Sequence, residues 1–384
     1  MKIAEVNVYF SPFMVGGAEW YVLNISKRLV EMGHEVHVFT ADKYRGEKAA
    51  PYEVMDDISV HRIPLRFDLS YRVKSWKGLG DAIAREKFDV IHSYDYAQVH
   101  SRTALRVAKK SGVPSALTVF DVHRMIPRPF YKQIPIRLFE SFFAGSVLND
   151  ATKILVRAPE LIPPLEKMGA KEEKIIITPS GINEDSLQSF DGKRFLSERA
   201  ISGSPLILFL GRLNPLKGPQ RILGVAPDIL KEFPDAAFVF VGPDQSGYSR
   251  TLREMTRGFA SHVFFLGAIY DFEEKMRVYA SCDLFVLPTT FEGTSQAIFE
   301  AMSQARPIIS TKTGGIPSQI DSGREGILVN YGDDEALKNA ILDLLKDRKK
   351  AQVLGSNARE KVRQFTYPIL ASNIERIYQS LRRD

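Results

Sequence analysis

The sequence predicts an α/β protein built from two doubly wound, parallel-sheet domains, and three observations support this. First, 384 residues are enough for about two domains of ordinary size, each with its own core. Second, short apolar runs alternate with longer amphipathic segments, which is typical of parallel sheets covered by helices on both faces. Third, hydrophobic residues make up 44% and charged residues 26% of the chain, which excludes a disordered or fibrous protein.

The strands are expected in two successive series. The first series comprises the apolar runs 2–8, 35–40, 89–93, 115–120, 153–156 and 174–178. The second series comprises 205–210, 236–241, 263–266, 283–287, 307–310 and 326–329. Helical periodicity is clearest at 18–32, 98–110 and 334–346.

The boundary between the domains is expected at 186–204, a polar segment that ends in Ser-Gly-Ser before a new strand. The two domains are therefore predicted at 1–190 and 200–365. The C-terminal segment has a helical pattern of apolar residues. They are Ile369, Ile374, Ile377 and Leu381.

The single cysteine, Cys282, cannot form an internal disulfide, and no apolar run approaches the roughly 18 residues of a membrane span. The first residues resemble a strand with an early acid rather than a signal peptide. We therefore expect a cytoplasmic protein, with peripheral attachment to the cytoplasmic face of a membrane as an open alternative.

The formal charge of +6 is distributed unevenly, because residues 60–137 carry 15 basic and 6 acidic side chains. This excess favours an anionic partner such as a phosphate group or a membrane surface, although a solvated basic face is an equally open interpretation. If the partner is a membrane, the cations expected to contact anionic lipid are Arg62, Arg66, Arg72, Lys74, Lys77 and Arg102. The helical segment 130–148 adds Phe139, Phe142 and Phe143, but a helix that is apolar nearly all round is expected to be buried core.

The first candidate site motif follows the first strand, where Gly16-Gly17-Ala18-Glu19 opens a helix. Glycines there allow a ligand to approach the backbone, and a helix N-terminus favours an anion. Taken alone, the pair is also compatible with an ordinary turn.

The second motif follows the run 205–210 and extends from Gly211 to Gly218. It contains Arg212 and Lys217 at the predicted carboxyl edge of the sheet. The planar donors of an arginine and the compact charge of a lysine together suit a diphosphate. The motif is not a Walker loop, since no G-x-x-x-x-G-K-[ST] occurs in the chain.

The third motif follows the run 283–287. Glu292 is expected in a loop, and Glu300 lies eight positions later, two turns into a helix. Amides at the helix start favour an anion, while a carboxylate such as Glu300 can accept hydrogen bonds from both ribose hydroxyls. The loop residues expected at the ligand, with free amides around 294–296, are Gly293, Thr294, Ser295 and Gln296. After the next strand, Gly314-Gly315 predicts another close approach.

No spacing in the sequence predicts a metal site. His34-Glu35-Val36-His37 is not H-E-x-x-H, and it lies where a helix ends and a strand begins. We therefore expect a structural role for this segment and neither a metal ion nor another cofactor.

Together the motifs resemble those of the family-four (group 1) retaining glycosyltransferases, which have the GT-B fold. The family pattern has a GGAE-like loop, a G-R-x(4)-K-G turn, an E-x(7)-E element and a Gly-Gly loop, and the chain carries them in this order at 16–19, 211–218, 292–300 and 313–315. The resemblance implies two Rossmann-like domains facing across a cleft, the first for the acceptor and the second for a nucleotide sugar. It also implies that the final helix, at 366–384, packs back onto the first domain.

By this resemblance, Arg212 and Lys217 hold the diphosphate of the nucleotide sugar. Glu300 holds the ribose, Glu292 contacts the donor sugar, and the Gly16–Gly17 pair lies close to the diphosphate. Arg212, Lys217 and Glu292 are the candidate catalytic residues in the motifs. The two cations would stabilise charge on a departing diphosphate, and Glu292 would contact the donor sugar.

Two positions depart from the family pattern. Phe120 stands where members often carry a histidine that contacts the reacting sugar, and His123 follows three positions later. Either His123 replaces it through a shifted loop, which makes it the fourth candidate catalytic residue, or the sugar site is built differently. The common Glu-Gly-Phe-Gly is Glu-Gly-Thr-Ser here, at 292–295.

The function predicted is transfer of a sugar, with retention, from a nucleoside diphosphate to a hydroxyl of a glycan, a lipid-linked or a small-molecule acceptor. The alternative is a sugar-nucleotide epimerase on the same fold, which would need no acceptor. A dinucleotide-dependent oxidoreductase would need a G-x-G-x-x-G directly after a strand, and the chain has none there. Nucleic-acid binding would leave the Glu292–Glu300 pair unexplained.

Overall fold

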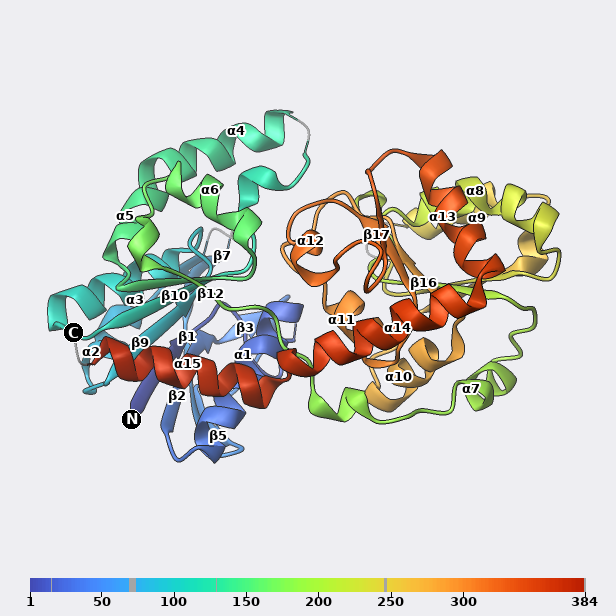
Figure 1. Ribbon diagram of the computed structural model, residues 1–384. Helices are drawn as coiled ribbons and strands as arrows, with labels where there is room; N and C mark the ends of the chain where they lie inside the picture. Colours follow the sequence, from blue (N-terminus) through green and yellow to red (C-terminus); the bar gives the residue numbers. More distant parts are fainter. Residues whose placement is uncertain (15, 69–73, 129, 245–246, 383–384) are drawn as a thin grey trace. The chain divides into compact units, whose positions relative to one another are not determined.

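The computed structural model describes residues 1–14, 16–68, 74–128, 130–244 and 247–382. They form two compact α/β units, one made of Met1–Gly181 and Tyr367–Asp384 and the other of Ile182–Thr366 (Figure 1). The chain therefore passes from the first unit to the second and back again. Within the described residues, no helix is long and apolar enough to cross a membrane.

The first crossing lies at Gly181 and Ile182, ahead of the boundary expected at 186–204. That segment contains a helix, α7 (Gly192–Glu198), which packs on α10 (Phe272–Ser281). A Cβ atom added to Gly192 would lie only 2.4 Å from the Ala280 carbonyl carbon. Because of this close packing, the segment belongs to the second unit rather than serving as a free linker.

The first unit has an eight-stranded sheet in the order β12-β11-β10-β9-β1-β2-β6-β5, parallel except for β5. Its strands are β1 (Lys2–Val6), β2 (Glu35–Ala41), β5 (Tyr52–Met55), β6 (Ile58–Ile63), β9 (Val90–Tyr94), β10 (Ser115–Val119), β11 (Lys153–Val156) and β12 (Ile175–Ile177). Two short hairpins, β3 (Lys43–Tyr44) with β4 (Glu47–Lys48) and β7 (Leu65–Asp68) with β8 (Lys74–Trp76), lie outside this sheet. The six strands predicted for this unit are confirmed, whereas β5, β6 and the hairpins were missed.

The helices of the first unit are α1 (Gly17–Glu31), α2 (Leu79–Ala84), α3 (Val99–Ser111), α4 (Phe130–Phe139), α5 (Gly145–Asp150), α6 (Ile162–Glu166) and α15 (Tyr367–Leu381). Figure 1 shows α15 running beside α1, and these helices share a core with the sheet. A separate core joins α2 and α3 to the sheet. The Tyr378 hydroxyl anchors α15 by donating to Glu5 Oε1 in β1 over 3.1 Å. The final helix thus belongs to the first unit, although Ile369 is exposed.

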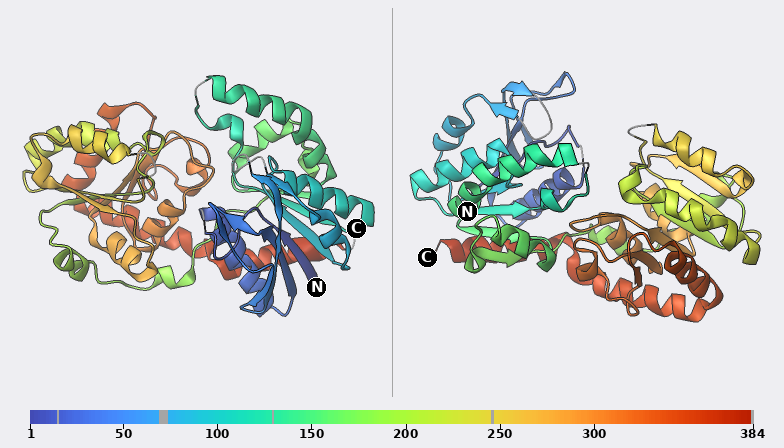
Figure 2. Two further views of the ribbon diagram at one scale, coloured as in Figure 1. Left: turned by 180° about the vertical axis from the view of Figure 1, so that it is seen from behind. Right: turned by 90° about the horizontal axis from the view of Figure 1, so that it is seen from above.

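The second unit has a fully parallel sheet in the order β15-β14-β13-β16-β17-β18. Its strands are β13 (Leu206–Leu210), β14 (Ala237–Val241), β15 (Val263–Gly267), β16 (Leu284–Leu287), β17 (Ile308–Thr311) and β18 (Ile327–Val329). With α7 and α10, its helices are α8 (Pro219–Glu232), α9 (Tyr248–Met255), α11 (Gln296–Ser303), α12 (Ile316–Gln319), α13 (Asp334–Lys346) and α14 (Arg348–Val362). They surround the sheet, as the views in Figure 2 show for this unit.

The strand order reverses between β13 and β16 in the second unit. In open parallel sheets, ligands bind beyond the carboxyl ends of the strands at such a switch point. The Arg212–Lys217 turn follows β13 and the Glu292 loop follows β16, so the fold places both predicted motifs at this point.

Candidate nucleotide-binding site

The turn after β13 is held against the loop after β16. The Thr290 amide donates to the Leu216 carbonyl oxygen over 2.8 Å, and a Cβ atom on Gly218 would lie 2.0 Å from the Pro288 carbonyl oxygen. Gly218 also has a φ of +77°, so a larger residue there would be strained. This close packing explains why a glycine ends the turn.

Lys217 and Glu292 form an ion pair between these two loops. Only 16% of the lysine side chain and 15% of the glutamate side chain are exposed. Asn214 positions the lysine backbone, because its Oδ1 accepts a hydrogen bond from the Lys217 amide over 3.1 Å. Arg212, by contrast, is exposed and its guanidinium has no hydrogen-bond or ion-pair partner among the described residues.

The Gly-Gly loop after β17 fixes the backbone of Glu292. The Gly315 amide donates to the Glu292 carbonyl oxygen over 2.8 Å. A Cβ atom on Gly314, whose φ is +54°, would lie 1.9 Å from the same oxygen. The predicted close approach is therefore made by the protein's own backbone.

The expected free amides before α11 are only partly correct. The Ser295 amide donates to Gln319 Oε1 over 2.7 Å, and Gln319 Nε2 donates to the Ser295 carbonyl oxygen over 3.0 Å. Ser295 is buried and its amide is therefore not available to an anion. α11 begins at Gln296 without a side-chain cap, so the amides of its first turn still lack intrahelical partners.

Glu300 is buried inside the second unit and is held at both oxygens. Lys275 Nζ lies 2.6 Å from Oε1, and the Tyr279 hydroxyl donates to Oε2 over 3.0 Å. Burial, reinforced by the Glu300 carboxylate, raises the pKa of Tyr279 well above its ordinary value, so the phenol stays a donor. Neither partner was predicted, although both lie on α10, four positions apart.

In the first unit, the Gly16–Gly17 pair opens α1 and is exposed. The Gly16 amide donates to Glu19 Oε2 over 2.8 Å, which is the glutamate half of a capping box, since glycine has no side chain to return a bond. A Cβ atom on Gly17 would meet nothing within 4 Å. The protein's own packing therefore does not require a glycine at 17.

His123 lies in a 3-10 turn after β10 and forms a pair with Asp95. Its Nε2 is 3.2 Å from both carboxylate oxygens of Asp95, which follows β9. Its Nδ1 is buried and lacks a hydrogen-bond partner in the described part of the chain. With Nε2 donating to Asp95, Nδ1 carries the lone pair and can accept a proton or a hydrogen bond.

Phe120, at the position of the family histidine, belongs to an aromatic cluster. It stacks on Tyr94 with ring centroids 5.9 Å apart and meets Tyr21 edge-on at 5.6 Å. The guanidinium of Arg157, which follows β11, lies 3.7 Å from the Tyr21 ring and 4.6 Å from the Phe120 ring. Burial lowers the pKa of Arg157. This buried cation was missed, although a charged residue directly after an apolar strand was a usable signal.

The basic segment is only partly a surface. Arg62 is buried and binds Glu53 and the Ser11 carbonyl oxygen, while Lys74 is buried over the Tyr9 ring. The expectation that both meet an anionic surface is therefore wrong, since their charges are used inside the unit. Arg66 and Lys77 are exposed, Arg102 is half-buried over Phe143, and Arg72 lies outside the described residues.

The helix α4 is not buried core, which corrects the prediction for 130–148. Five large apolar side chains on α4 and the π-helical turn after it are exposed; they are Phe130, Tyr131, Ile134, Leu138 and Phe142. Spacings of four residues from 130 to 142 place four of them along one helical stripe. Phe143 packs against Arg102, and the Phe139 side chain lies outside the described residues.

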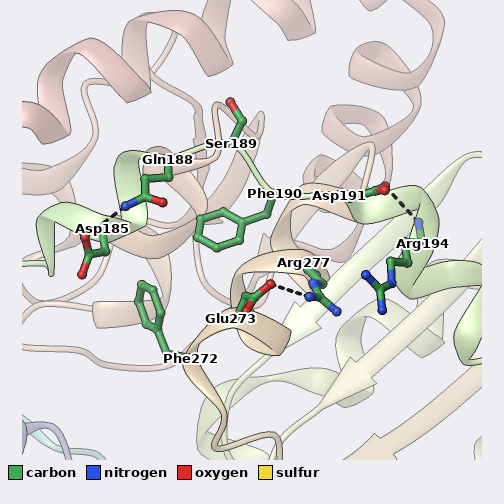
Figure 3. Close-up of a pocket in the computed structure, with 9 residues that line it drawn as sticks. All are labelled: Asp185, Gln188, Ser189, Phe190, Asp191, Arg194, Phe272, Glu273 and Arg277. Atoms are coloured by element: carbon green, nitrogen blue, oxygen red, sulfur yellow. Dashed lines mark hydrogen bonds and ion pairs between the residues drawn. The ribbon is translucent and has the colours of Figure 1, made fainter.

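A shallow cavity of about 630 Å³ lies elsewhere in the second unit (Figure 3). None of the predicted site residues lines it. The lining residues are Asp185, Gln188, Ser189, Phe190, Asp191, Arg194, Phe272, Glu273 and Arg277. Its arginines are already paired, Arg194 with Glu198 and Arg277 with Glu273. The motif loops at the switch point, rather than this cavity, are therefore the better candidate site.

These observations define a protein of two doubly wound α/β units with a candidate ligand site at the switch point of the second. The chain belongs to the group 1 glycosyltransferases: residues 193–361 match the family described as "Glycosyl transferases group 1" and residues 16–181 match "Glycosyl transferase 4-like domain". Its fold is the GT-B fold, as expected from the sequence.

Three similar proteins illustrate the relationship. An uncharacterized glycosyltransferase of Methanocaldococcus jannaschii is 24% identical over 99% of both chains. A phosphatidyl-myo-inositol mannosyltransferase of Mycobacterium leprae is 26% identical over 99% of this chain and 97% of its own. The structure of Anabaena HepE in complex with UDP covers 99% of this chain and 100% of its own, with 18% identity and a TM-score of 0.79.

Proposed function

We propose that this chain transfers a sugar, with retention, from a nucleoside diphosphate to an acceptor hydroxyl and needs no metal ion for the transfer. The observation that carries the proposal is the Lys217–Glu292 ion pair at the switch point, with the guanidinium of Arg212, which has no partner among the described residues, on the same turn. When a ligand displaces Glu292 from Lys217, the two cations of this turn suit a diphosphate. The UDP bound to the structural relative supports a nucleotide donor.

In this proposal the bond between the sugar and the diphosphate breaks while a bond to the acceptor oxygen forms. Negative charge grows on the departing diphosphate, and Arg212 and Lys217 stabilise it. Removing one such fixed donor typically costs about 10² to 10³ in rate. Glu292 contacts the donor sugar once its lysine has moved to the diphosphate.

Glu300 binds the ribose in this proposal. A carboxylate has about four acceptor positions, so the bonds from Lys275 and Tyr279 leave acceptor capacity for two ribose hydroxyls. These bonds also fix the carboxylate before the ligand arrives, which reduces the ordering cost of binding.

The first unit is proposed to receive the acceptor. His123 is proposed to accept a hydrogen bond from a substrate hydroxyl, with Asp95 orienting the ring; because Nδ1 is buried in this structure, the side chain must become accessible when the substrate binds. A Cβ atom on Gly17 meets nothing within 4 Å among the described residues, so the backbone there is open to a ligand.

A lipid-linked acceptor at an anionic membrane surface is the acceptor class that the first unit supports best. The apolar stripe along α4 is exposed, and Arg137 on the same helix is exposed as well. Exposed cations also lie on α3, at Arg106 and Lys110. Apolar anchors beside cations are the composition of helices that lie in a membrane interface.

The proposal is tested first by thermal shift with UDP, GDP, ADP and TDP. A nucleotide at 100 times its Kd stabilises the folded chain by about 2.7 kcal/mol, which ranks the candidates. The Arg212→Ala and Lys217→Met variants should lose the thermal shift caused by the nucleotide. The Arg348→Ala variant, which changes an exposed arginine, is the matched control and should retain this shift.

Product analysis then separates the alternatives. Incubation of the best nucleotide's sugar conjugates with acceptor should release the nucleoside diphosphate and give a glycoside with unchanged anomeric configuration, also in the presence of EDTA. Conversion of the sugar nucleotide into its epimer without acceptor would instead support the epimerase. No nucleotide shift in the wild-type chain would contradict the proposed site.

A further inference from the structure

Two histidines and a glutamate from separate segments converge in the first unit, although no spacing in the sequence suggested it. His37 lies on β2, His61 on the neighbouring strand β6, and Glu86 follows α2. One ligand atom from each lies within 4.8 Å of the others. His37 Nδ1 is 2.9 Å from His61 Nε2 and 3.7 Å from Glu86 Oε2.

A second carboxylate orients the central histidine. Glu35 Oε1 lies 2.8 Å from His37 Nε2, so this nitrogen carries the proton and Nδ1 presents its lone pair to His61 and Glu86. A metal-binding histidine commonly has this arrangement, in which the far nitrogen donates to a carboxylate that fixes the tautomer. His37 is buried and its ring is packed edge-on against Phe88, which restricts the ring further.

We propose that His37 Nδ1, His61 Nε2 and a Glu86 carboxylate oxygen bind a divalent transition-metal ion of the zinc type. Zinc bonds of about 2.0–2.1 Å at a tetrahedral angle place ligand atoms about 3.3 Å apart. The separations of 2.9 and 3.7 Å from His37 Nδ1 lie on either side of this value, and the ligand atoms of His61 and Glu86 lie within 4.8 Å of each other, so the side chains have to adjust to bind an ion. A water molecule would complete the coordination.

The site is structural and independent of the proposed sugar transfer. Lys2 and Glu35 begin β1 and β2, so the cluster lies toward the amino ends of these strands, whereas the predicted substrate motifs follow carboxyl ends. A bound ion would connect β2, β6 and the segment after α2, three parts of the chain that are far apart in sequence. It would therefore stabilise the folded unit.

Lys2 is the competitor for this ion. Its Nζ lies 2.8 Å from Glu35 Oε1 and 2.7 Å from Glu86 Oε2. A metal ion must displace the ammonium group from Glu86, and the two cations repel each other. Replacing Lys2 with Met should thus tighten metal binding by about tenfold.

The test is titration of the chelator-stripped full chain with Zn²⁺ by calorimetry, followed by thermal unfolding with and without the ion. One equivalent should bind and raise the Tm, and Co²⁺ in its place should give the visible absorption of a tetrahedral site. His61→Ala and Glu86→Gln should each weaken Zn²⁺ binding at least tenfold. The Glu86 variant keeps the side-chain shape, so its result remains informative if His61→Ala folds poorly.

His262→Ala is the matched control, because His262 is half-buried in the second unit and its ring donates to the Ala236 carbonyl oxygen. It should bind Zn²⁺ as the wild type does. The proposal is overturned if the wild type and Lys2→Met both bind no stoichiometric Zn²⁺, or if His61→Ala and Glu86→Gln bind it with unchanged affinity. Sugar-transfer activity does not enter this test.

Discussion

Lys217 and Glu292, 75 positions apart in the chain, neutralise each other at the switch point of the second sheet. Each residue comes from a loop that follows a different strand, and the hydrogen bond from the Thr290 amide to Leu216 holds these loops together. The lysine is consequently not free in this structure. A diphosphate has to compete with Glu292 for it.

This competition predicts that Glu292→Gln separates binding from turnover. The neutral amide no longer holds Lys217, so the nucleoside diphosphate should bind several-fold more tightly, while transfer should slow because the contact to the donor sugar is altered. Calorimetry and initial rates with the nucleotide found by thermal shift measure the two effects. Weaker nucleotide binding in this variant would contradict the competition.

Glu300 should discriminate ribose from sugars that lack its hydroxyls. Glu300→Gln should weaken binding of the preferred nucleoside diphosphate about tenfold. Binding of its 2′,3′-dideoxy analogue should be almost unchanged, because only the ribose hydroxyls need the carboxylate. Tyr279→Phe removes one bond that holds Glu300 and should produce part of this loss, on the order of 1 kcal/mol. Equal losses for both nucleotides would indicate a structural effect instead.

Gly314→Ala should destabilise the second unit, because its Cβ atom would lie 1.9 Å from the Glu292 carbonyl oxygen at a φ of +54°. Overpacking of this kind costs about 1–3 kcal/mol in the free energy of unfolding. Gly224→Ala is the control, since Gly224 is exposed within α8 and its added Cβ meets nothing within 4 Å. It should stabilise by about 0.5–1 kcal/mol. Urea unfolding of both variants measures the difference.

Glu5 should make the stability of the first unit depend on pH. Burial raises the pKa of this carboxyl to about 7, against bonds from Tyr94 and Tyr378 that lower it. The folded state thus holds the proton more tightly than the unfolded chain. The part of the free energy of unfolding that comes from this proton is therefore complete below about pH 4.5 and is lost as the pH rises to 7. The loss amounts to about 3 kcal/mol at most.

The Glu5→Gln variant cannot lose this proton. Its free energy of unfolding, measured in urea from pH 4.5 to 8, should therefore fall less with rising pH than that of the wild type. Parallel profiles for the two proteins would show that the titration of Glu5 does not contribute.

The α4 stripe should bind the chain to anionic vesicles. Replacing Leu138 and Phe142 together with Ser should reduce sedimentation with phosphatidylglycerol vesicles several-fold, because two exposed apolar anchors are removed. The exposed Val353 of α14, in the second unit, is the matched control when replaced by Ser. No sedimentation of the wild-type chain at low salt would contradict membrane contact.

Local patterns were sufficient to predict most of the sheet. Continuous apolar runs such as 237–241 are confirmed because a strand buried on both faces tolerates little else. The strands β5 and β6 were missed because neither is a continuous apolar run: the side chains of β5 alternate between exposed and half-buried, and those of β6 alternate between buried and half-buried over most of its length. Residues of this edge, including His61 and Arg62, look polar until the neighbouring strands show what they contact.

The sequence alone therefore determined the fold class, the family and the loops that carry Arg212, Lys217, Glu292 and Glu300, because strand patterns and short motifs are local properties. Only the tertiary structure decided which of their groups are engaged. Gln319 occupies the Ser295 amide, Lys275 and Tyr279 hold Glu300, and α4 leaves its apolar stripe exposed. The contacts of Ser295 and Glu300 join residues that are more than 20 positions apart, and the exposure of α4 depends on what packs against it. Local sequence patterns do not reveal which of these distant side chains meet after folding.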